Sequence, residues 1–291
     1  MQAVDTPPPR LDGALAIVAG AGRGIGRAIA VQFAAAGARL VLAARTESEL
    51  RKTADLCAAH GTSAEVVRTD VASEAEVEAL VDRAGAPDVA VNAAGVYGPI
   101  GRSLEVDAQE WARAVGINLV GTFHFCRAVA RPMVEQRRGK IIVLAGGGAT
   151  APLPFFSSYA ASKAGVVRLV ETLAEELAEA NVQVNAIAPG LVDTQLQDDV
   201  LAAGDRAGPL FEKIRAARES GAGAVGPEVA AQLALFLASA ESGTLTGKLV
   251  AAPHDPWREW TDRGDELNSS PLYTLRRLDR HTLEPLLERM K

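Results

Sequence analysis

The sequence predicts an α/β fold: one domain with a doubly wound parallel sheet of about seven strands and helices on both of its faces. The length of 291 residues suits a single large α/β domain. A wholly apolar run at 14–19 and further short, strand-like runs alternate with segments of helical period along most of the chain. Strands that are buried on both faces have this continuous apolar composition, which indicates a parallel sheet.

The elements follow one another in a regular order. The first apolar run leads into a glycine-rich turn and then a helix that carries Ile25, Ile29 and Phe33 on one face and ends at Gly37. The expected strands are 14–19, 39–43, 64–68, 89–93, 140–144, 182–187 and 248–252. The later helices are expected at 47–59, 73–84, 107–137, 157–180 and 227–239, with two short helices and glycine-rich joints within 191–226.

The two ends of the chain differ from this pattern. Residues 1–12, with three prolines, predict a flexible arm, and residues 13–252 are expected to form the main domain, which includes the functional site. Residues 253–291 are an appended extension that contains Trp257, Trp260 and several leucines. The extension docks on its own subunit, or it covers the active site or contacts a partner subunit.

Composition excludes several classes of function. The net charge is −6 and no basic stripe is present, which argues against a nucleic-acid partner. No run approaches the ~18 apolar residues of a membrane span, and the first ten residues lack the pattern of a secretory signal. Cys57, Cys126 and the four histidines show no metal-ligand spacing, so no metal site is expected. We therefore expect a cytoplasmic protein that acts on a small molecule.

The glycine-rich turn predicts a dinucleotide site. Gly20, Gly22, Gly24 and Gly26 lie between a buried strand and a helix. Glycines let the backbone approach a pyrophosphate closely, and the helix N-terminus offers free N–H groups to the anion. A structural alternative is a merely tight strand–helix turn.

The second strand bears on which dinucleotide is bound. An acidic residue at its end would accept hydrogen bonds from the adenosine ribose and repel a 2′-phosphate. Here the strand ends at Ala44-Arg45, and Arg23 lies in the glycine turn. Two arginines and no acid favour NADP(H), with NAD(H) as the other option.

Together these segments resemble the short-chain dehydrogenase/reductase family over about residues 12–252. The turn is similar to the family's TGxxxGxG, with Ala19 in place of Thr; Asn92-Ala93-Ala94-Gly95 is similar to NNAG; Tyr159-Ala-Ala-Ser-Lys163 matches YxxxK; and Pro189-Gly190 begins a PG motif. The resemblance implies a Rossmann-type fold and a homodimer or homotetramer built on the two long helices. The cofactor-binding residues it implies are Gly20, Gly22, Arg23, Gly24, Ile25, Gly26, Arg45, Asp70, Val71, Asn92, Ala93, Gly95, Tyr159, Lys163, Pro189, Gly190, Val192 and Thr194.

The reacting residues are expected to be Tyr159 and Lys163. They are four residues apart and share one helical face. An adjacent ammonium stabilises a phenolate and lowers the phenol pKa, so Tyr159 would exchange a proton with a substrate oxygen. The resemblance further implies that Lys163 holds the nicotinamide ribose and that Asn118 holds a water linking Lys163 to solvent.

One family residue is missing. Counting thirteen residues back from Tyr159, where the family has Ser, leads to Gly146. Losing such a hydrogen-bond donor costs about 2.7–4 kcal/mol of transition-state stabilisation. Three interpretations remain open: the glycine run supplies backbone N–H groups or admits a water; Thr150, Ser157 or Ser158 replaces the hydroxyl; or the site performs proton chemistry such as elimination or isomerisation.

The expected substrate pocket lies at the carboxyl ends of the strands. Residues 191–226 are predicted to form a lid with leucines on its inner face and several aspartates beside them, which favours an apolar or weakly cationic substrate. The pocket residues are expected to be Gly146, Gly147, Gly148, Leu191 and Leu196.

The function expected from the sequence is that of an NADP(H)-dependent oxidoreductase acting on a small carbonyl/alcohol or imine/amine substrate. The alternatives are a redox-silent member of the family that uses a retained cofactor, and a cofactor-binding protein without enzymatic activity.

Overall fold

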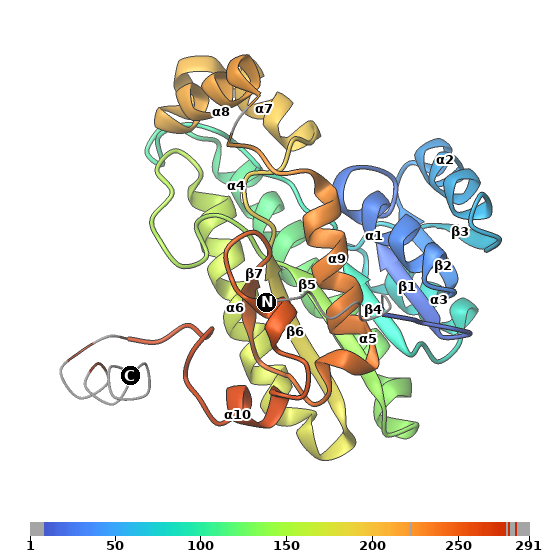
Figure 1. Cartoon of the computed structure of the whole chain (residues 1–291). Coiled ribbons are helices and arrows are strands. Elements are labelled where there is room, and N and C mark those ends of the chain that lie inside the picture. The colour runs from blue at the N-terminus through green and yellow to red at the C-terminus, as the bar shows by residue number, and fades with distance from the viewer. Residues whose placement is uncertain (1–8, 222, 278, 280–282, 284–291) are drawn as a thin grey trace.

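A seven-stranded parallel sheet forms the centre of the computed structural model, which describes residues 9–221, 223–277, 279 and 283. The strand order is β3-β2-β1-β4-β5-β6-β7, with the reversal between β1 and β4. This confirms the predicted Rossmann-type sheet (Figure 1). The strands are β1 (Leu15–Ala19), β2 (Arg39–Ala44), β3 (Ala64–Arg68), β4 (Val89–Asn92), β5 (Gly139–Leu144), β6 (Val182–Ala188) and β7 (Leu249–Ala251).

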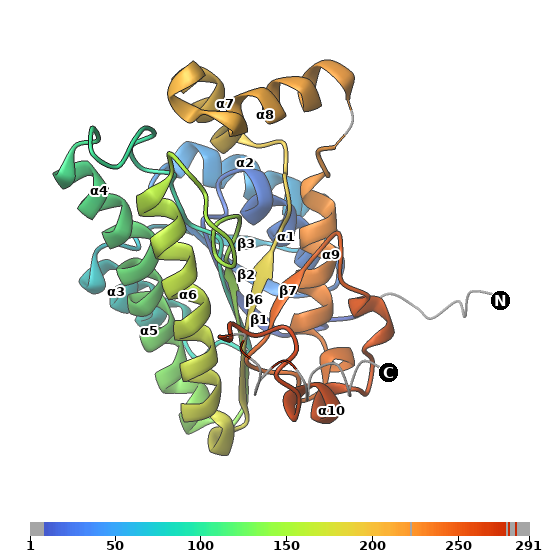
Figure 2. The ribbon, with the colours of Figure 1, turned by 90° about the vertical axis from the view of Figure 1, so that its left-hand side faces the viewer.

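Helices cover both faces of the sheet, so the described part of the domain has three layers (Figure 2). Each face has its own apolar core, because alternate residues of every strand point to opposite sides. The helices on one face are α1 (Gly24–Ala35), α2 (Glu47–Ala58) and α9 (Pro227–Ala238). Those on the other are α3 (Glu74–Ala84), α5 (Gly121–Glu135) and α6 (Ser157–Glu176), with α4 (Ala108–Val115) beside α6.

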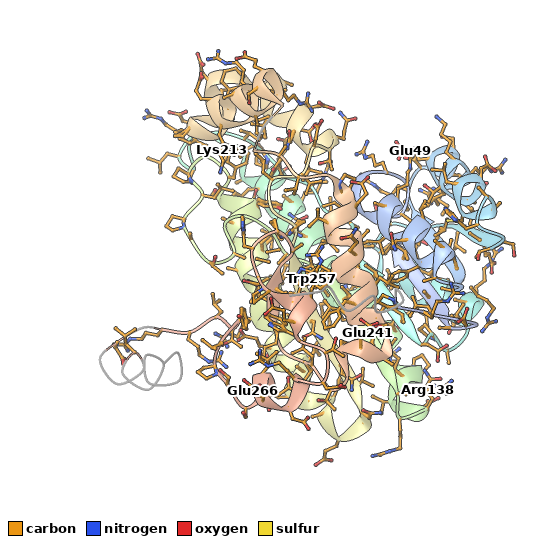
Figure 3. All side chains as sticks on the ribbon, in the orientation of Figure 1. Glu49, Arg138, Lys213, Glu241, Trp257 and Glu266 are labelled. Carbon is orange, nitrogen blue, oxygen red and sulfur yellow. The ribbon has the colours of Figure 1, made fainter. Side chains whose placement is uncertain are left out.

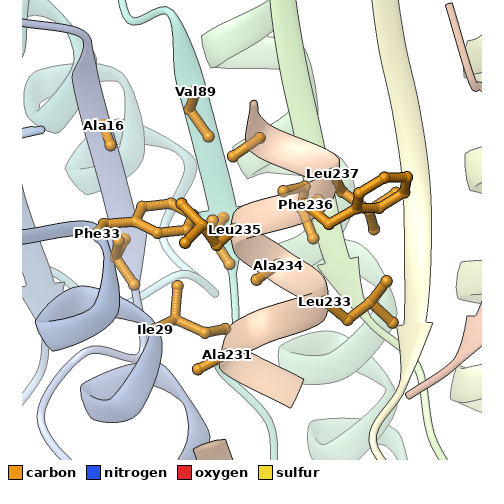
Figure 4. Close-up of a cluster of buried hydrophobic side chains, with 14 of the residues drawn as sticks. Ala16, Ile29, Phe33, Val89, Ala231, Leu233, Ala234, Leu235, Phe236 and Leu237 are labelled. Atoms are coloured by element: carbon orange, nitrogen blue, oxygen red, sulfur yellow. The ribbon is translucent and has the colours of Figure 1, made fainter. Parts of the chain in front are cut away.

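The contact between α1 and α9 fixes the helix that follows the glycine turn. Ile29 and Phe33 of α1 are fully buried against Ala231 and Leu235 of α9 (Figure 4). Removing a buried Phe side chain costs about 3–5 kcal/mol. This packing therefore holds the N-terminus of α1 firmly at the carboxyl end of β1.

The helix predicted over 107–137 is interrupted. A π-helical turn, Gly116–Val120, separates α4 from α5. Such turns insert one residue into the helical repeat and are frequent at functional sites. Here the turn contains Asn118, whose side chain is fully buried.

The predicted lid has the expected two helices, α7 (Gln195–Ala203) and α8 (Pro209–Ser220). Its two ends are joined, since Val192 and Val225 form a β-bridge and the Val225 N–H donates to the Leu191 carbonyl at 2.9 Å. The lid therefore leaves and rejoins the domain at one point, above the carboxyl ends of the strands (Figure 2).

The described part of the C-terminal extension packs on the domain at the end remote from α7 and α8 (Figures 1 and 2). Trp257 and Trp260 are buried in the core that contains α9, and Trp257 donates to the Ala252 carbonyl. The Leu249 N–H of edge strand β7 donates to the Tyr273 carbonyl. The extension thus docks on its own subunit, and its first residue, Pro253, lies against Gly190 just beyond the end of β6. Three leucines of the extension, Leu278, Leu286 and Leu287, lie outside the described residues.

The buried carboxylate of Glu171 on α6 anchors this extension. It accepts hydrogen bonds from the Leu275 N–H at 2.5 Å and from Arg276 at 3.1 Å. At the other end of the chain, Leu11 is buried, and its N–H donates to the Ala36 carbonyl at 2.8 Å. The last described residues of the expected arm therefore belong to the domain.

Candidate active site

A groove runs along the carboxyl edge of the sheet, at the point where the strand order reverses between β1 and β4. This is where α/β sheets bind ligands, because the loops on the two sides of the reversal diverge. The predicted residues that line it are Gly20, Gly22, Arg23, Gly24, Ile25, Gly26, Arg45, Asp70, Val71, Ala93, Gly95, Tyr159, Lys163, Pro189, Thr194 and Leu196.

The glycine turn forms one wall of the groove and leaves no room for side chains. A Cβ on Gly20, whose φ is +78°, would lie 2.6 Å from the Ala94 backbone nitrogen. A Cβ on Gly26 would lie 2.2 Å from the Gly20 carbonyl oxygen. The turn can therefore present its backbone N–H groups and the N-terminus of α1 directly to an anion, which fits a pyrophosphate.

Two side chains that the sequence did not single out hold this turn. The buried Thr53 hydroxyl of α2 donates to the Ala21 carbonyl at 2.9 Å. Arg27 of α1 donates to Thr53 at 3.1 Å and also to the Gly22 carbonyl. These bonds satisfy the Ala21 and Gly22 carbonyl groups, and the Gly20 and Ala21 N–H groups donate to the Ala43 carbonyl of β2, so the turn is held on both sides.

The end of the groove beside β2 is lined by both positively and negatively charged side chains. Arg23 and Arg45 line it, as expected, and Asp70 lies across from them. Glu49, from the first turn of α2, lines the same wall and lies 3.7 Å from Arg23. Sequence reasoning considered only the strand end and missed this carboxylate, which the fold brings in from four residues further along.

Tyr159 and Lys163 lie together in the opposite part of the groove. Both are buried, and the Lys163 Nζ is 5.6 Å from the centre of the Tyr159 ring. Lys163 donates a hydrogen bond of 2.6 Å to the Leu144 carbonyl at the end of β5. The ammonium is therefore held by the sheet and faces the phenol from one turn along α6.

The expected lowering of the Tyr159 pKa was wrong for this structure. Burial raises the pKa of the phenol above its ordinary value, and the neighbouring Tyr97 adds to the shift. Burial also lowers the pKa of Lys163 to about 8. The ammonium lies over the ring, 5.6 Å from its centre, and the loss of water around the phenolate dominates the shift in the Tyr159 pKa. Tyr159 is thus a neutral O–H donor at pH 7.

Asn118 anchors the loop that follows β4. Its side-chain oxygen accepts from the Val96 N–H at 2.9 Å, and its side-chain nitrogen donates to the Val96 carbonyl at 2.8 Å. A Cβ on Gly95 would lie 3.2 Å from the Asn118 oxygen and 3.6 Å from the Lys163 nitrogen. The amide of Asn118 is therefore occupied by the backbone, beside Lys163.

Gly146 lies directly against the Tyr159 hydroxyl. A Cβ at this position would be 2.4 Å from the phenol oxygen, and the φ of Gly146 is +154°, which side chains rarely adopt. Where the family has a serine side chain, this chain therefore has a glycine whose backbone lies against the phenol. A serine hydroxyl does not fit here without displacing Tyr159.

The side chains considered as replacements for the serine are engaged or remote. The Ser157 hydroxyl accepts from the Trp111 indole at 3.0 Å, and Ser158 donates to the Tyr97 carbonyl at 3.2 Å. Thr150 is exposed. Of the three hypotheses, replacement by one of these hydroxyls therefore has the least support.

The lid forms an apolar cluster above Tyr159. Tyr97, in the loop that follows β4, contacts the Tyr159 ring edge-on with centroids 4.8 Å apart. Burial, together with Asp199, raises the pKa of Tyr97 to about 12. Tyr97, two residues after Gly95, could have been predicted from the sequence as a residue beside Tyr159, but the sequence analysis did not consider it. The partly buried residues of this cluster include Leu191, Leu201, Leu210 and Phe211.

The aspartates of the lid are not all free to meet a substrate. Arg218 forms ion pairs with Asp193 at 2.9 Å and with Asp198 at 2.6 Å. Burial raises the pKa of Asp199, while Arg23 of the glycine turn opposes that shift. Of the four lid aspartates, Asp193, Asp198, Asp199 and Asp205, two are therefore paired with Arg218, which weakens the preference for a cationic substrate inferred from them.

Several predicted site residues do not line the groove. Asn92 is buried, accepting from the Ala94 N–H and donating to Thr122, so it fixes the loop from below. Gly190 packs against Pro253, and Val192 belongs to the bridge at the base of the lid. Gly147 is exposed, with nothing within 4 Å of its added Cβ. Gly148 packs against Ala160 of α6, so it shapes the turn rather than the pocket floor.

The described residues contain no group of three or more His, Cys, Asp or Glu side chains that could hold a metal ion. Within the same residues, no helix is both long and apolar enough to cross a membrane. Cys57 and Cys126 are free and buried, and burial raises the pKa of each thiol, to about 11 and about 12 respectively.

Comparison with known proteins identifies relatives of this chain. Residues 14–204 match the family model described as short chain dehydrogenase. The chain is 34% identical over 240 residues to the 3-oxoacyl-[acyl-carrier-protein] reductase FabG of Escherichia coli (strain K12), covering 82% of this chain and 95% of the relative. It is 39% identical over 250 residues to the short-chain reductase protein NovJ of Streptomyces niveus, covering 81% and 91%. It is 36% identical over 248 residues to 3beta-hydroxysteroid dehydrogenase 1 of Eggerthella lenta, again covering 81% and 91%.

Solved structures share the fold. An NAD+-bound xylitol dehydrogenase aligns with a TM-score of 0.76 at 27% identity, covering 82% of this chain and 97% of that one. A variant of actinorhodin polyketide ketoreductase with NADPH aligns with a TM-score of 0.75 at 31% identity, covering 82% and 95%. One of these structures holds NAD+ and the other NADPH.

Proposed function

Because this chain belongs to the short-chain dehydrogenase/reductase family, we propose that it is an NADP(H)-dependent oxidoreductase acting on a small carbonyl/alcohol or imine/amine substrate. Its relatives include acyl-carrier-protein reductases and hydroxysteroid dehydrogenases, which carry out this class of reaction. The observation that carries the proposal is the pairing of Tyr159 and Lys163 in the groove that begins at the glycine turn.

The residues of the groove fit a nicotinamide dinucleotide. The glycine turn and the N-terminus of α1 would hold the pyrophosphate, and Lys163 would hold the nicotinamide ribose. The cofactor, when bound, supplies or accepts a hydride. Arg23 and Arg45 support a preference for the 2′-phosphate of NADP(H), although NAD(H) fits the rest of the groove.

Tyr159 acts as the proton donor in this mechanism. As a neutral phenol it donates its O–H to the substrate carbonyl oxygen, and it releases the proton as the oxygen gains negative charge. The nearby Lys163 ammonium stabilises the phenolate that results. The neutral phenol is the form of Tyr159 that the reductive direction requires, and burial keeps its pKa above the ordinary value.

The chain's own groups also shape the substrate side. Tyr97, Phe156 and the apolar residues of the lid exclude water from the Tyr159 hydroxyl. A carbonyl on an apolar skeleton suits this lining better than a phosphorylated one. We expect the working form to be a homodimer or homotetramer.

A direct test measures turnover of NADPH with a panel of ketones and imines, and of NADP+ with alcohols. We expect oxidation of NADPH with at least one ketone or imine, and a fall of about 10²- to 10⁴-fold for Tyr159→Phe, which removes the donated proton. Unchanged turnover in Tyr159→Phe would refute the mechanism.

A second candidate function is proton chemistry with a retained cofactor, such as elimination or isomerisation. The observation that favours it is Gly146, which offers no side-chain hydroxyl beside Tyr159. Product formed from a hydroxy- or enone-type substrate without net change in the cofactor would support this function over the first.

A further inference from the structure

Glu49 is a carboxylate inside the part of the groove where an adenosine 2′-phosphate would lie. It belongs to the first turn of α2 and lines the same wall as Arg23, Arg45 and Thr46 (Figure 3 labels it). Its side chain is about one-third exposed, at 32%, so it faces the groove rather than the core. No step of the proposed mechanism uses it.

The carboxylate lies against the glycine turn. A Cβ on Gly22 would be 3.1 Å from both the Cβ and the Oε2 atom of Glu49. The other oxygen, Oε1, is 3.7 Å from the Arg23 guanidinium. Glu49 therefore neutralises one of the two arginines on which NADP(H) selectivity depends.

A phosphate monoester carries about −1.5 to −2 charges at neutral pH. Bound beside Arg23 and Arg45, it would meet the negative charge of Glu49 at short range and would compete with it for Arg23. An uncharged ribose 2′-hydroxyl meets no such repulsion and can donate a hydrogen bond to a carboxylate. The Glu49 side chain thus weakens the binding of NADP(H) and is compatible with the binding of NAD(H).

We infer that Glu49 is a selectivity residue that weakens binding of the 2′-phosphate, so that this chain prefers NADP(H) to NAD(H) by much less than Arg23 and Arg45 alone would produce. The inference rests on the proposed dinucleotide function and names a further determinant of that site. On this inference, Arg23 in the glycine turn and Arg45 at the end of the second strand do not by themselves set the cofactor preference.

The test measures dissociation constants of NADPH and NADH by titration calorimetry on the purified protein, which requires no substrate. Glu49→Gln keeps the size of the side chain and removes its charge. We expect the ratio Kd(NADH)/Kd(NADPH) to rise about five- to tenfold, as expected for removal of a close, partly screened charge. The gain should shrink at high salt.

Glu47→Gln is the matched control. It removes the same charge from the same turn of α2, but Glu47 is exposed, pairs with Arg51 at 2.6 Å and does not line the groove. We expect it to leave the ratio within twofold of the parent protein. A thermal unfolding curve for each variant verifies that the fold is retained.

The outcomes separate this inference from the function on which it rests. If Glu49→Gln leaves the ratio unchanged, or if Glu47→Gln shifts it equally, the role of Glu49 is refuted while the dinucleotide site stands. If the parent protein binds neither NADPH nor NADH, the proposed function is itself refuted, and the inference with it.

Discussion

Adding a single methyl group at Gly146 should disable Tyr159 while leaving the glycine turn of the cofactor groove intact. In Gly146→Ala the new Cβ would lie 2.4 Å from the Tyr159 hydroxyl, whereas Cβ contacts below 3.0 Å are essentially not seen. The two atoms must therefore separate by at least 3.0 − 2.4 = 0.6 Å. Tyr159 is buried and packs against Tyr97, so its ring has little freedom to move.

The expected loss follows from this displacement. A misplacement of about 1 Å at a reacting group can lower the rate about 10²-fold. A shift of 0.6 Å or more should therefore reduce kcat by about ten- to a hundredfold, or about 1.4–2.7 kcal/mol in the activation free energy. Gly146→Ser introduces the same Cβ, so it should also lose activity although it restores the hydroxyl that the family normally has.

The assay compares kcat for NADPH oxidation, with the best ketone or imine of the panel, in Gly146→Ala, Gly146→Ser and the control Gly147→Ala. Nothing lies within 4 Å of a Cβ added at Gly147, so this control should retain near-parental activity. The dissociation constant of NADPH should stay within about twofold in all three, since neither glycine lines the cofactor groove. A higher kcat in Gly146→Ser, or equal activity in Gly146→Ala and Gly147→Ala, would show that this account of the pocket is wrong.

Three further variants test the supports of the site. Thr53→Val should weaken NADPH binding about five- to tenfold in calorimetry, because it removes a hydrogen bond worth about 1 kcal/mol from the glycine turn. Lys163→Met should be inactive yet more resistant to urea than the parent at pH 7. Burial lowers the pKa of Lys163 to about 8, so between pH 8 and about 10.5 the unfolded parent binds more protons than the folded parent. The free energy of unfolding of the parent therefore rises with pH in this window, and the difference in favour of Lys163→Met should shrink. Glu171→Gln should lower Tm by about 2–6 °C and expose the C-terminal extension to limited proteolysis, because the buried carboxylate holds its backbone.

Each of these variants has a control or an opposing result. Thr62→Val lies remote from the groove and should bind NADPH normally, so an equal loss there would remove the argument for Thr53. For Lys163→Met, an advantage that grows with rising pH would contradict the sign of the lysine shift. Glu175→Gln removes an exposed charge from the same helix as Glu171, and an equal fall in its Tm would mean that the extension is held by something else.

The strands and the glycine turn could be predicted from the sequence, because the signals for them are local. A strand buried on both faces is rich in apolar residues, as β1 is at every position and β5 is over its last four residues. Tyr159 and Lys163 share a helix face whatever surrounds them, so their pairing also follows from their spacing. The break at Gly116–Val120 was missed because a π turn leaves the helical periodicity on each side nearly unchanged.

The electrostatic state of the site depended on contacts between segments far apart in the chain. The sequence shows an ammonium four residues from a phenol, but only the fold shows how deeply both are buried, and burial sets the direction of the Tyr159 pKa. Glu49 enters the groove because α2 turns back over the glycine turn, a placement that no spacing rule predicts.

The chain's own sequence thus determined the sheet, the cofactor turn and the identity of the reacting pair, since each rests on residues within one or two turns of each other. The tertiary structure alone decided the distance from Gly146 to Tyr159, the docking of the extension through Glu171 and the presence of a carboxylate beside Arg23. These depend on how separate elements pack, and packing fixes distances and solvation that the order of residues does not contain.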